Sequence, residues 1–177
     1  MLVRSGANRR VGSKAKMGHS QLRRVIIDQT MFSMAFERDV DFQDVCPIST
    51  YLDLESGEVE WIYENDEDAY MEAGISPEEN STLRERTNAS PQQYLEIPGL
   101  DHGDHHELLR EFLDSDWTEN MEDHTRARIA YSGSIGGWKK SVNDDRIVHA
   151  FYDYRERKTQ QLAEEFLREH GVEPEWK

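Results

Sequence analysis

Two alternating runs of residues around a Ser-Gly pair are the strongest structural constraint in the sequence. The stretch ISTYLDLESGEVEWIY places one run at 48–54 and the other at 58–63, with Ser56 and Gly57 between them. Polar and apolar residues alternate in both runs, as they do in half-buried strands. Glycine supplies the positive φ that a tight two-residue turn needs, so this stretch predicts a β-hairpin.

The hairpin's predicted register decides which side chains share a face. If Glu55 pairs with Glu58, Leu52 lies opposite Trp61 on the face that we predict to be core. The other face then sets Asp53 against Glu60, and like charges opposite each other cost a few tenths of a kcal/mol. Two interpretations stay open for that face: a solvated surface or an acidic binding surface.

Three later segments complete the predicted fold. QYLEIPGL predicts a short strand at about 94–97, and LLREFL predicts an amphipathic helix. The C-terminal part predicts one long amphipathic helix or two abutting helices, which end at Gly171 with Pro174 beyond. The sequence therefore predicts an α+β fold over 25–177: a small antiparallel sheet, formed by the hairpin at about 48–63 and the strand at about 94–97, packed by C-terminal helices.

Charge is distributed unevenly along the 177 residues. The chain has a net charge of −15, yet residues 1–24 hold seven Lys and Arg and no acid, which leaves −22 for the remainder. This composition predicts that residues 1–24 form a basic disordered arm. Such an arm suits a nucleic-acid-binding tail, part of a targeting peptide or an unstructured extension, and Met17 would also serve as a start.

An acidic segment follows the hairpin. Residues 53–83 contain eleven carboxylates and no Lys or Arg, and we predict an acidic loop excursion at about 64–92. The calcium-loop pattern is absent from ENDEDAYMEAG. Our leading hypothesis is a non-catalytic interaction or regulatory module that binds a basic protein partner. The predicted acidic surface consists of Asp53, Glu60, Glu64, Asp66, Glu67 and Asp68.

The stretch LDHGDHHELLREF has the composition of a metal site. Asp104 and Glu107 have capping-box spacing, which predicts a helix that begins at Asp104 and leaves His102 outside it. The histidines are then exposed polar residues at a helix start. The alternative hypothesis is a divalent-metal-dependent hydrolase, with Asp101, Asp104 or Glu107 as its carboxylate base. Its predicted metal ligands are His102, His105 and His106.

A third hypothesis concerns the C-terminal basic residues. YSGSIGGWKKS lacks the spacing of a phosphate loop and of a nucleophile elbow. An aromatic residue next to lysines can still stack on and neutralise a nucleic acid, although the acidic body of the chain repels polyanions. The residues of this predicted patch are Trp138, Lys139, Lys140, Arg155, Arg157 and Lys158.

Cysteine content and hydropathy bear on the compartment. Cys46 is the single cysteine, which fits a reducing setting, and its apolar neighbours predict a small buried residue. No apolar run reaches the roughly 18 residues that a membrane span needs. We predict a cytoplasmic protein with no membrane contact and no cofactor.

Several of these motifs occur together in one known family. YLDLESGEVEWI, YLEIPGLD, an amphipathic helix with REFL, GGWKK and AFYDYRERKTQQLAEEFLREHGVE resemble, in this order, the bacterial uncharacterised protein family number 0158 of the UPF series. The resemblance covers about 31–172 and implies a compact intracellular α+β domain without an assigned activity. The family carries mixed acids, Ser, Lys and Arg at 101–106, which implies that the histidine cluster is not a family feature.

Overall fold

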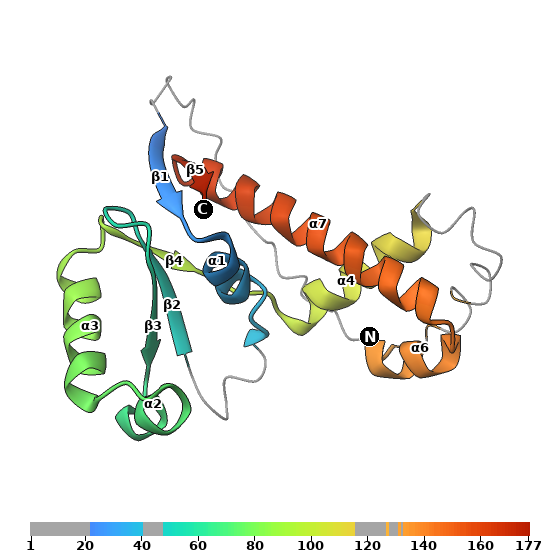
Figure 1. The fold of residues 1–177 in the computed structure, drawn as a ribbon, viewed down its shortest axis with the longest axis horizontal. Helices are drawn as coiled ribbons and strands as arrows, with labels where there is room; N and C mark the ends of the chain where they lie inside the picture. The colour runs from blue at the N-terminus through green and yellow to red at the C-terminus, as the bar shows by residue number, and fades with distance from the viewer. Residues whose placement is uncertain (1–21, 41–47, 116–126, 128–130, 132) are drawn as a thin grey trace, which may run out of the picture.

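Two small sheets and one long helix organise the chain (Figure 1). The computed structural model describes residues 22–40, 48–115, 127, 131 and 133–177. Its elements, in order, are β1 Arg23–Ile27, α1 Gln29–Phe36, β2 Ile48–Asp53, β3 Val59–Tyr63, α2 Asp66–Ala73, α3 Pro77–Ala89, β4 Tyr94–Ile97, α4 His102–Asp114, α6 Ile135–Val142, α7 Asp145–Glu169 and β5 Val172–Trp176.

The larger sheet has the strand order β3-β2-β4 and is antiparallel throughout. Its members are the predicted hairpin and the predicted strand at 94–97, and helices from the C-terminal half pack beside it. The predicted α+β class is therefore confirmed. The second sheet is a parallel pair, β1 with β5, which we did not predict.

The predicted register of the hairpin is wrong by two residues. Leu52 lies opposite Val59, and Thr50 lies opposite Trp61. The turn is longer than two residues, because the Asp53 N–H bonds the Glu58 carbonyl across it. A shift of two preserves which face each side chain occupies, so Leu52 still enters the core. Glu60 lies opposite Tyr51, and the predicted pairing of two carboxylates does not occur.

The segment at 64–92, which was predicted to be a loop, contains the helices α2 and α3. Capping residues close to each helix start explain why they form. Asn65 caps α2 by accepting the Glu67 N–H, and Ser76 caps α3 in a capping box with Glu79. Pro77 follows Ser76 at the first helical position, where its missing N–H is harmless. In Figure 1, α3 lies beside the hairpin and α2 lies at the end of β3.

The hydrophobic core consists of two clusters that share α7. One lies between β1, α1, the larger sheet and the C-terminal half of α7, and includes Phe32, Leu52 and Leu167. The other lies between α4, α6 and the N-terminal half of α7, around Phe112 and Trp138. Because α7 is one helix of 25 residues, it joins both clusters (Figure 1).

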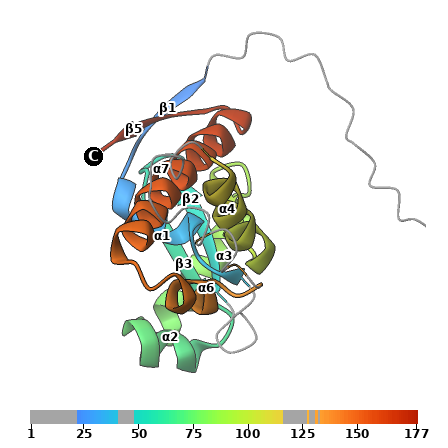
Figure 2. The same cartoon turned by 90° about the vertical axis from the view of Figure 1, so that its right-hand side faces the viewer.

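The parallel pair brings the two ends of the described chain together. Arg23 lies opposite Val172 and Ile27 opposite Trp176, and Figure 2 shows the two strands side by side along α7. Arg23 and Arg24 thus belong to β1, which corrects the boundary of the predicted arm. Residues 1–21 of that arm, and Cys46, lie outside the described residues. Among the described helices, none has both the length and the apolar character that a bilayer crossing requires.

Candidate functional sites

Asp53 serves the hairpin turn and does not lie on an acidic surface. The residue is 4% exposed, and its carboxylate accepts hydrogen bonds from the Glu55 N–H at 2.8 Å and from Gln93 Nε2 at 3.1 Å. Burial alone would raise the pKa of Asp53, but these hydrogen bonds outweigh burial and hold the pKa below its usual value.

Asp66 is also engaged within the fold. Its carboxylate accepts from Asn80 Nδ2 at 2.6 Å and pairs with Arg84 at 3.2 Å, which ties the start of α2 to α3. Glu60 is half-buried, and this burial raises its pKa although the charge of Arg86 acts in the opposite direction. Three of the six predicted acidic residues therefore have partly or wholly structural environments.

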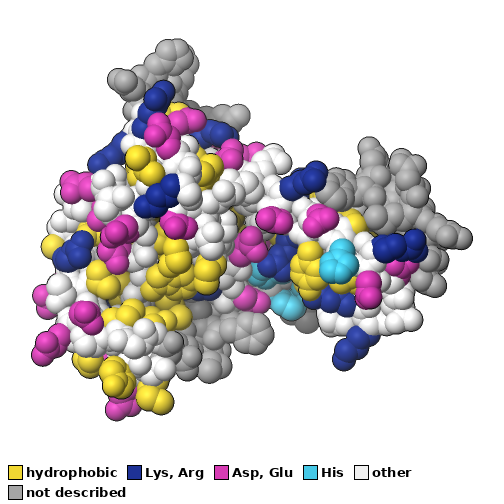
Figure 3. All heavy atoms as spheres, in the orientation of Figure 1, with side chains coloured by type: hydrophobic (Ala, Val, Ile, Leu, Met, Phe, Trp, Pro, Cys, Tyr) yellow, Lys and Arg dark blue, Asp and Glu magenta, His cyan; other side chains and the backbone are white. Residues whose placement is uncertain are grey.

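The remaining predicted acids lie on α2 or, in the case of Glu64, just before it. Glu64 and Glu67 are exposed and Asp68 is half-buried. Beside them, Tyr70 is 63% exposed and Met71 is 79% exposed, more than any other large hydrophobic residue among the described ones. Figure 3 shows hydrophobic and acidic side chains together at the lower end of the molecule, where α2 lies. We call this the α2 surface; it consists of Glu64, Glu67, Asp68, Tyr70 and Met71.

A groove of about 830 Å³ lies next to the α2 surface, where α2 ends and α3 begins. Glu60, Glu78 and Glu79 line it together with the apolar side chains of Ile75 and Leu83, and Arg86 contributes one cation. The groove thus combines acidic and apolar groups with one cation beyond the C-terminal end of α2.

Helix α4, which carries the histidine cluster, begins two residues earlier than predicted, at His102. Asp101, not Asp104, is the N-cap of α4, and it forms the capping box with Asp104. His102 is consequently the first helical residue. This correction places His102 and His106 four residues apart on one face of α4, with ring centroids 4.3 Å apart.

His106 is the buried member of the cluster, with 6% of its surface exposed. Its Nδ1 lies 2.5 Å from the Tyr131 hydroxyl, while its Nε2 is buried without a hydrogen-bond partner among the described residues. Burial, and then the charges of His102 and Arg110, lower the pKa of His106. Within the described ranges, no three His, Cys, Asp or Glu side chains converge as metal ligands, so the predicted set of three histidines is not assembled.

The predicted nucleic-acid patch is not assembled either. Trp138 is fully buried, donates from Nε1 to the Ala127 carbonyl at 2.9 Å and packs edge-on against Phe112 and Phe151. Its ring therefore cannot stack on a base.

The cations of that patch contact groups within the protein. Lys158 pairs with Glu111 at 3.1 Å, Arg155 pairs with Glu37 at 2.8 Å, and Lys139 lies over the ring of Tyr152. Lys140 and Arg157 are exposed. These contacts neutralise or shield charge that a phosphate backbone would need, so the structure offers no support for nucleic-acid binding there.

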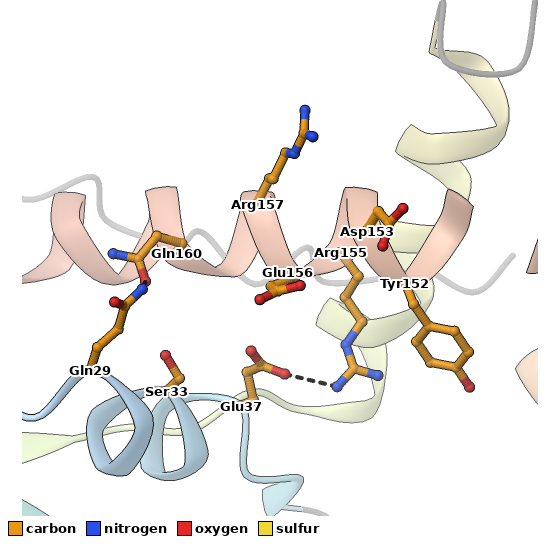
Figure 4. Close-up of a pocket in the computed structure, with 9 residues that line it drawn as sticks. All are labelled: Gln29, Ser33, Glu37, Tyr152, Asp153, Arg155, Glu156, Arg157 and Gln160. Carbon is orange, nitrogen blue, oxygen red and sulfur yellow. Dashed lines mark hydrogen bonds and ion pairs between the residues drawn. The ribbon is translucent and has the colours of Figure 1, made fainter. Parts of the chain in front are cut away.

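A polar groove of about 740 Å³ between α1 and α7 was not predicted (Figure 4). Gln29 bonds Gln160 across it at 3.2 Å, and Glu37 accepts from Arg155 and Thr159. Figure 4 shows Arg157 turned away from these groups. Because these hydrogen bonds connect α1 to α7, we interpret the groove as part of the packing interface between the two helices. In the sequence, the capping residue Asp28 could have indicated the start of α1, but nothing indicated that α1 packs against α7.

Comparisons with known proteins found no matching family model, no matching curated protein and no matching solved structure. The resemblance described above stays a prediction based on its motifs.

Proposed function

We propose that this protein is a non-catalytic interaction module that binds a basic protein segment through the α2 surface. The observation that carries the proposal is the exposure of Tyr70 and Met71, at 63% and 79%, next to acidic side chains. Aromatic residues and methionine are enriched in protein interfaces, where burying them supplies binding free energy.

The fold explains the acids of this surface better than it explains the apolar residues. Glu67 and Asp68 lie in the first turn of α2, where carboxylates interact favourably with the positive end of the helix dipole. Ala69 of α2 is fully buried and packs the helix against the protein. Tyr70 and Met71 contribute little to that packing, so a binding role accounts for them more directly.

Charge supports a basic partner. Residues 53–83 contain eleven carboxylates without a Lys or Arg, and the chain outside residues 1–24 carries −22. A field of one sign accelerates association with a partner of the opposite sign and weakens as salt rises. The apolar pair then provides contacts that salt does not screen.

The proposal also covers the cellular compartment and the protein family. We propose that the partner is met in the cytoplasm, which the single cysteine supports, and that the chain is related to the bacterial uncharacterised family named above, which the quoted motifs support.

Binding of a defined peptide tests the proposal. The probe is a fluorescently labelled peptide of alternating Lys or Arg and Leu or Phe, with a matched peptide in which Glu replaces the basic residues. Fluorescence anisotropy should show saturable binding of the basic peptide only. The double variant Tyr70→Ser/Met71→Ser should weaken binding roughly tenfold or more, equivalent to about 1.4 kcal/mol or more.

Matched variants separate this surface from general acidity. Glu64→Gln/Glu67→Gln should weaken binding and reduce its salt dependence, whereas Glu165→Gln/Glu169→Gln removes the same charge from exposed positions on α7 and should have little effect. Leu162→Ser is the apolar control on α7. Equal losses in test and control variants, or no binding of the basic peptide, would refute the proposal.

A further inference from the structure

His102 and His106 have the spacing of a metal-binding pair. Two histidines four residues apart lie on the same face of a helix, and this spacing recurs in zinc sites. Here α4 begins at His102, and the two rings lie 4.3 Å apart between centroids. His105 lies between them in sequence and about 100° from His106 around the helix.

An unsatisfied atom points to a missing ligand at this pair. His106 Nε2 is buried and has no hydrogen-bond partner in the part of the chain that the structure describes. Buried polar side-chain atoms nearly always have one, and leaving such an atom unpaired is destabilising. An unprotonated imidazole nitrogen can instead donate its lone pair to a metal ion.

The other ring nitrogen has the partner that a metal-ligating histidine needs. His106 Nδ1 lies 2.5 Å from the Tyr131 hydroxyl oxygen. When Nδ1 carries the proton and donates it to this oxygen, Nε2 presents its lone pair. Such a bond from the second nitrogen fixes the tautomer and orientation of metal-binding histidines.

We propose that His102 and His106 form a two-histidine site for a zinc-type transition metal ion. Imidazole nitrogens suit Zn²⁺, and water completes its coordination, because no third protein ligand converges here within the described part of the chain. The site is distinct from the α2 surface, and it does not depend on the proposed function. The bound metal ion would link the exposed side chain of His102, the first residue of α4, to the buried side chain of His106.

Nearby charge does not prevent binding. Arg110 follows His106 by one turn, and a cation there repels a metal ion. Its guanidinium, however, pairs with Glu107 at 2.9 Å, which offsets part of its charge.

Zinc titration of the full chain tests the site. Isothermal titration calorimetry with Zn²⁺, in chelator-washed buffer near neutral pH, should show one saturable site per chain. His102→Ala should weaken this binding at least tenfold, and the exposed position of His102 makes the variant compatible with folding. His105→Ala is the matched control and should bind as wild type does.

A second readout follows the fold. Zn²⁺ should raise the melting temperature of wild type and His105→Ala but not of His102→Ala, because a ligand that binds only the folded state stabilises it. Absence of zinc binding, binding that survives His102→Ala, or equal loss in both variants would overturn the proposal.

Discussion

Asn80 in α3 hydrogen-bonds both backbone groups of Tyr63 at the end of strand β3. Its amide oxygen accepts the Tyr63 N–H at 3.0 Å, and its Nδ2 donates to the Tyr63 carbonyl at 2.9 Å. β3 is an edge strand of its sheet, and Asn80 is fully buried against it. A side chain thus takes the place of a neighbouring strand and limits pairing at this edge.

Replacing Asn80 should destabilise the fold. In Asn80→Ala the Tyr63 N–H loses its acceptor, while Arg84 still donates to the Tyr63 carbonyl at 2.6 Å. One orphaned buried donor lowers the free energy of unfolding by about 1–3 kcal/mol, measurable by urea denaturation. Asn88→Ala, at an exposed position of the same helix, should change it by less than about 0.5 kcal/mol. Equal midpoints for the two variants would contradict this account.

Gly57→Ala should separate the hairpin turn from β1. A Cβ on Gly57 would lie 1.8 Å from the Ile26 carbonyl oxygen, and the residue has a φ of +75°. Left-handed backbone and forced packing together predict a loss of about 3 kcal/mol or more. Gly74→Ala has a similar φ of +68° but meets no heavy atom within 4 Å, so it should lose only about 1–2 kcal/mol. Thermal unfolding of both variants measures the difference, and equal losses would show that the contact with β1 is unimportant.

Local patterns predicted the elements that depend on nearby residues. The hairpin, the strand at 94–97 and the termination of α7 just before Gly171 follow from alternation, helical spacing and turn residues. The β1–β5 pair joins Arg23 to Val172, and a contact between such distant segments leaves no local signal. The α2 and α3 caps were visible in the sequence, but weak apolar periodicity in this acidic segment concealed the helices.

In the candidate sites, too, some features follow from the local sequence and others depend on the tertiary structure. Asp101–Asp104 and Asp104–Glu107 have the same capping-box spacing, so spacing alone could not decide where α4 begins. The alignment of His102 with His106 depends on that start and could not be predicted either. The burial of Trp138 was predictable from its helical spacing with Ile135 and Val142. The exposure of Tyr70 and Met71 depends on how α2 sits on the protein, and only the tertiary structure shows it.

Asp53 should make stability depend on acid pH. Its folded-state pKa lies below its usual value, so the stabilisation is complete above the usual aspartate pKa and is lost as pH falls through the folded-state pKa. Asp53→Asn should lower the free energy of unfolding by about 1–3 kcal/mol near neutral pH, and this deficit should shrink as the solution is acidified. Urea denaturation at several pH values measures it. Asp153→Asn, at an exposed position on α7, should show no such trend; a deficit in Asp53→Asn that stays constant with pH would contradict the assignment.

The ion pair between Glu37 and Arg155 should couple α1 to α7 measurably. Their charged atoms lie 2.8 Å apart and both side chains are about one-third exposed or less, so the pair is partly shielded from water (Figure 4). A double-mutant cycle with Glu37→Gln and Arg155→Met, followed by urea denaturation, should give a coupling of about 1 kcal/mol that falls at high salt. The Arg24–Glu175 pair, at 3.7 Å with side chains 79% and 52% exposed, is the matched control and should show little coupling. Equal coupling in the two cycles would mean that the bond across the α1–α7 groove does not hold the two helices together.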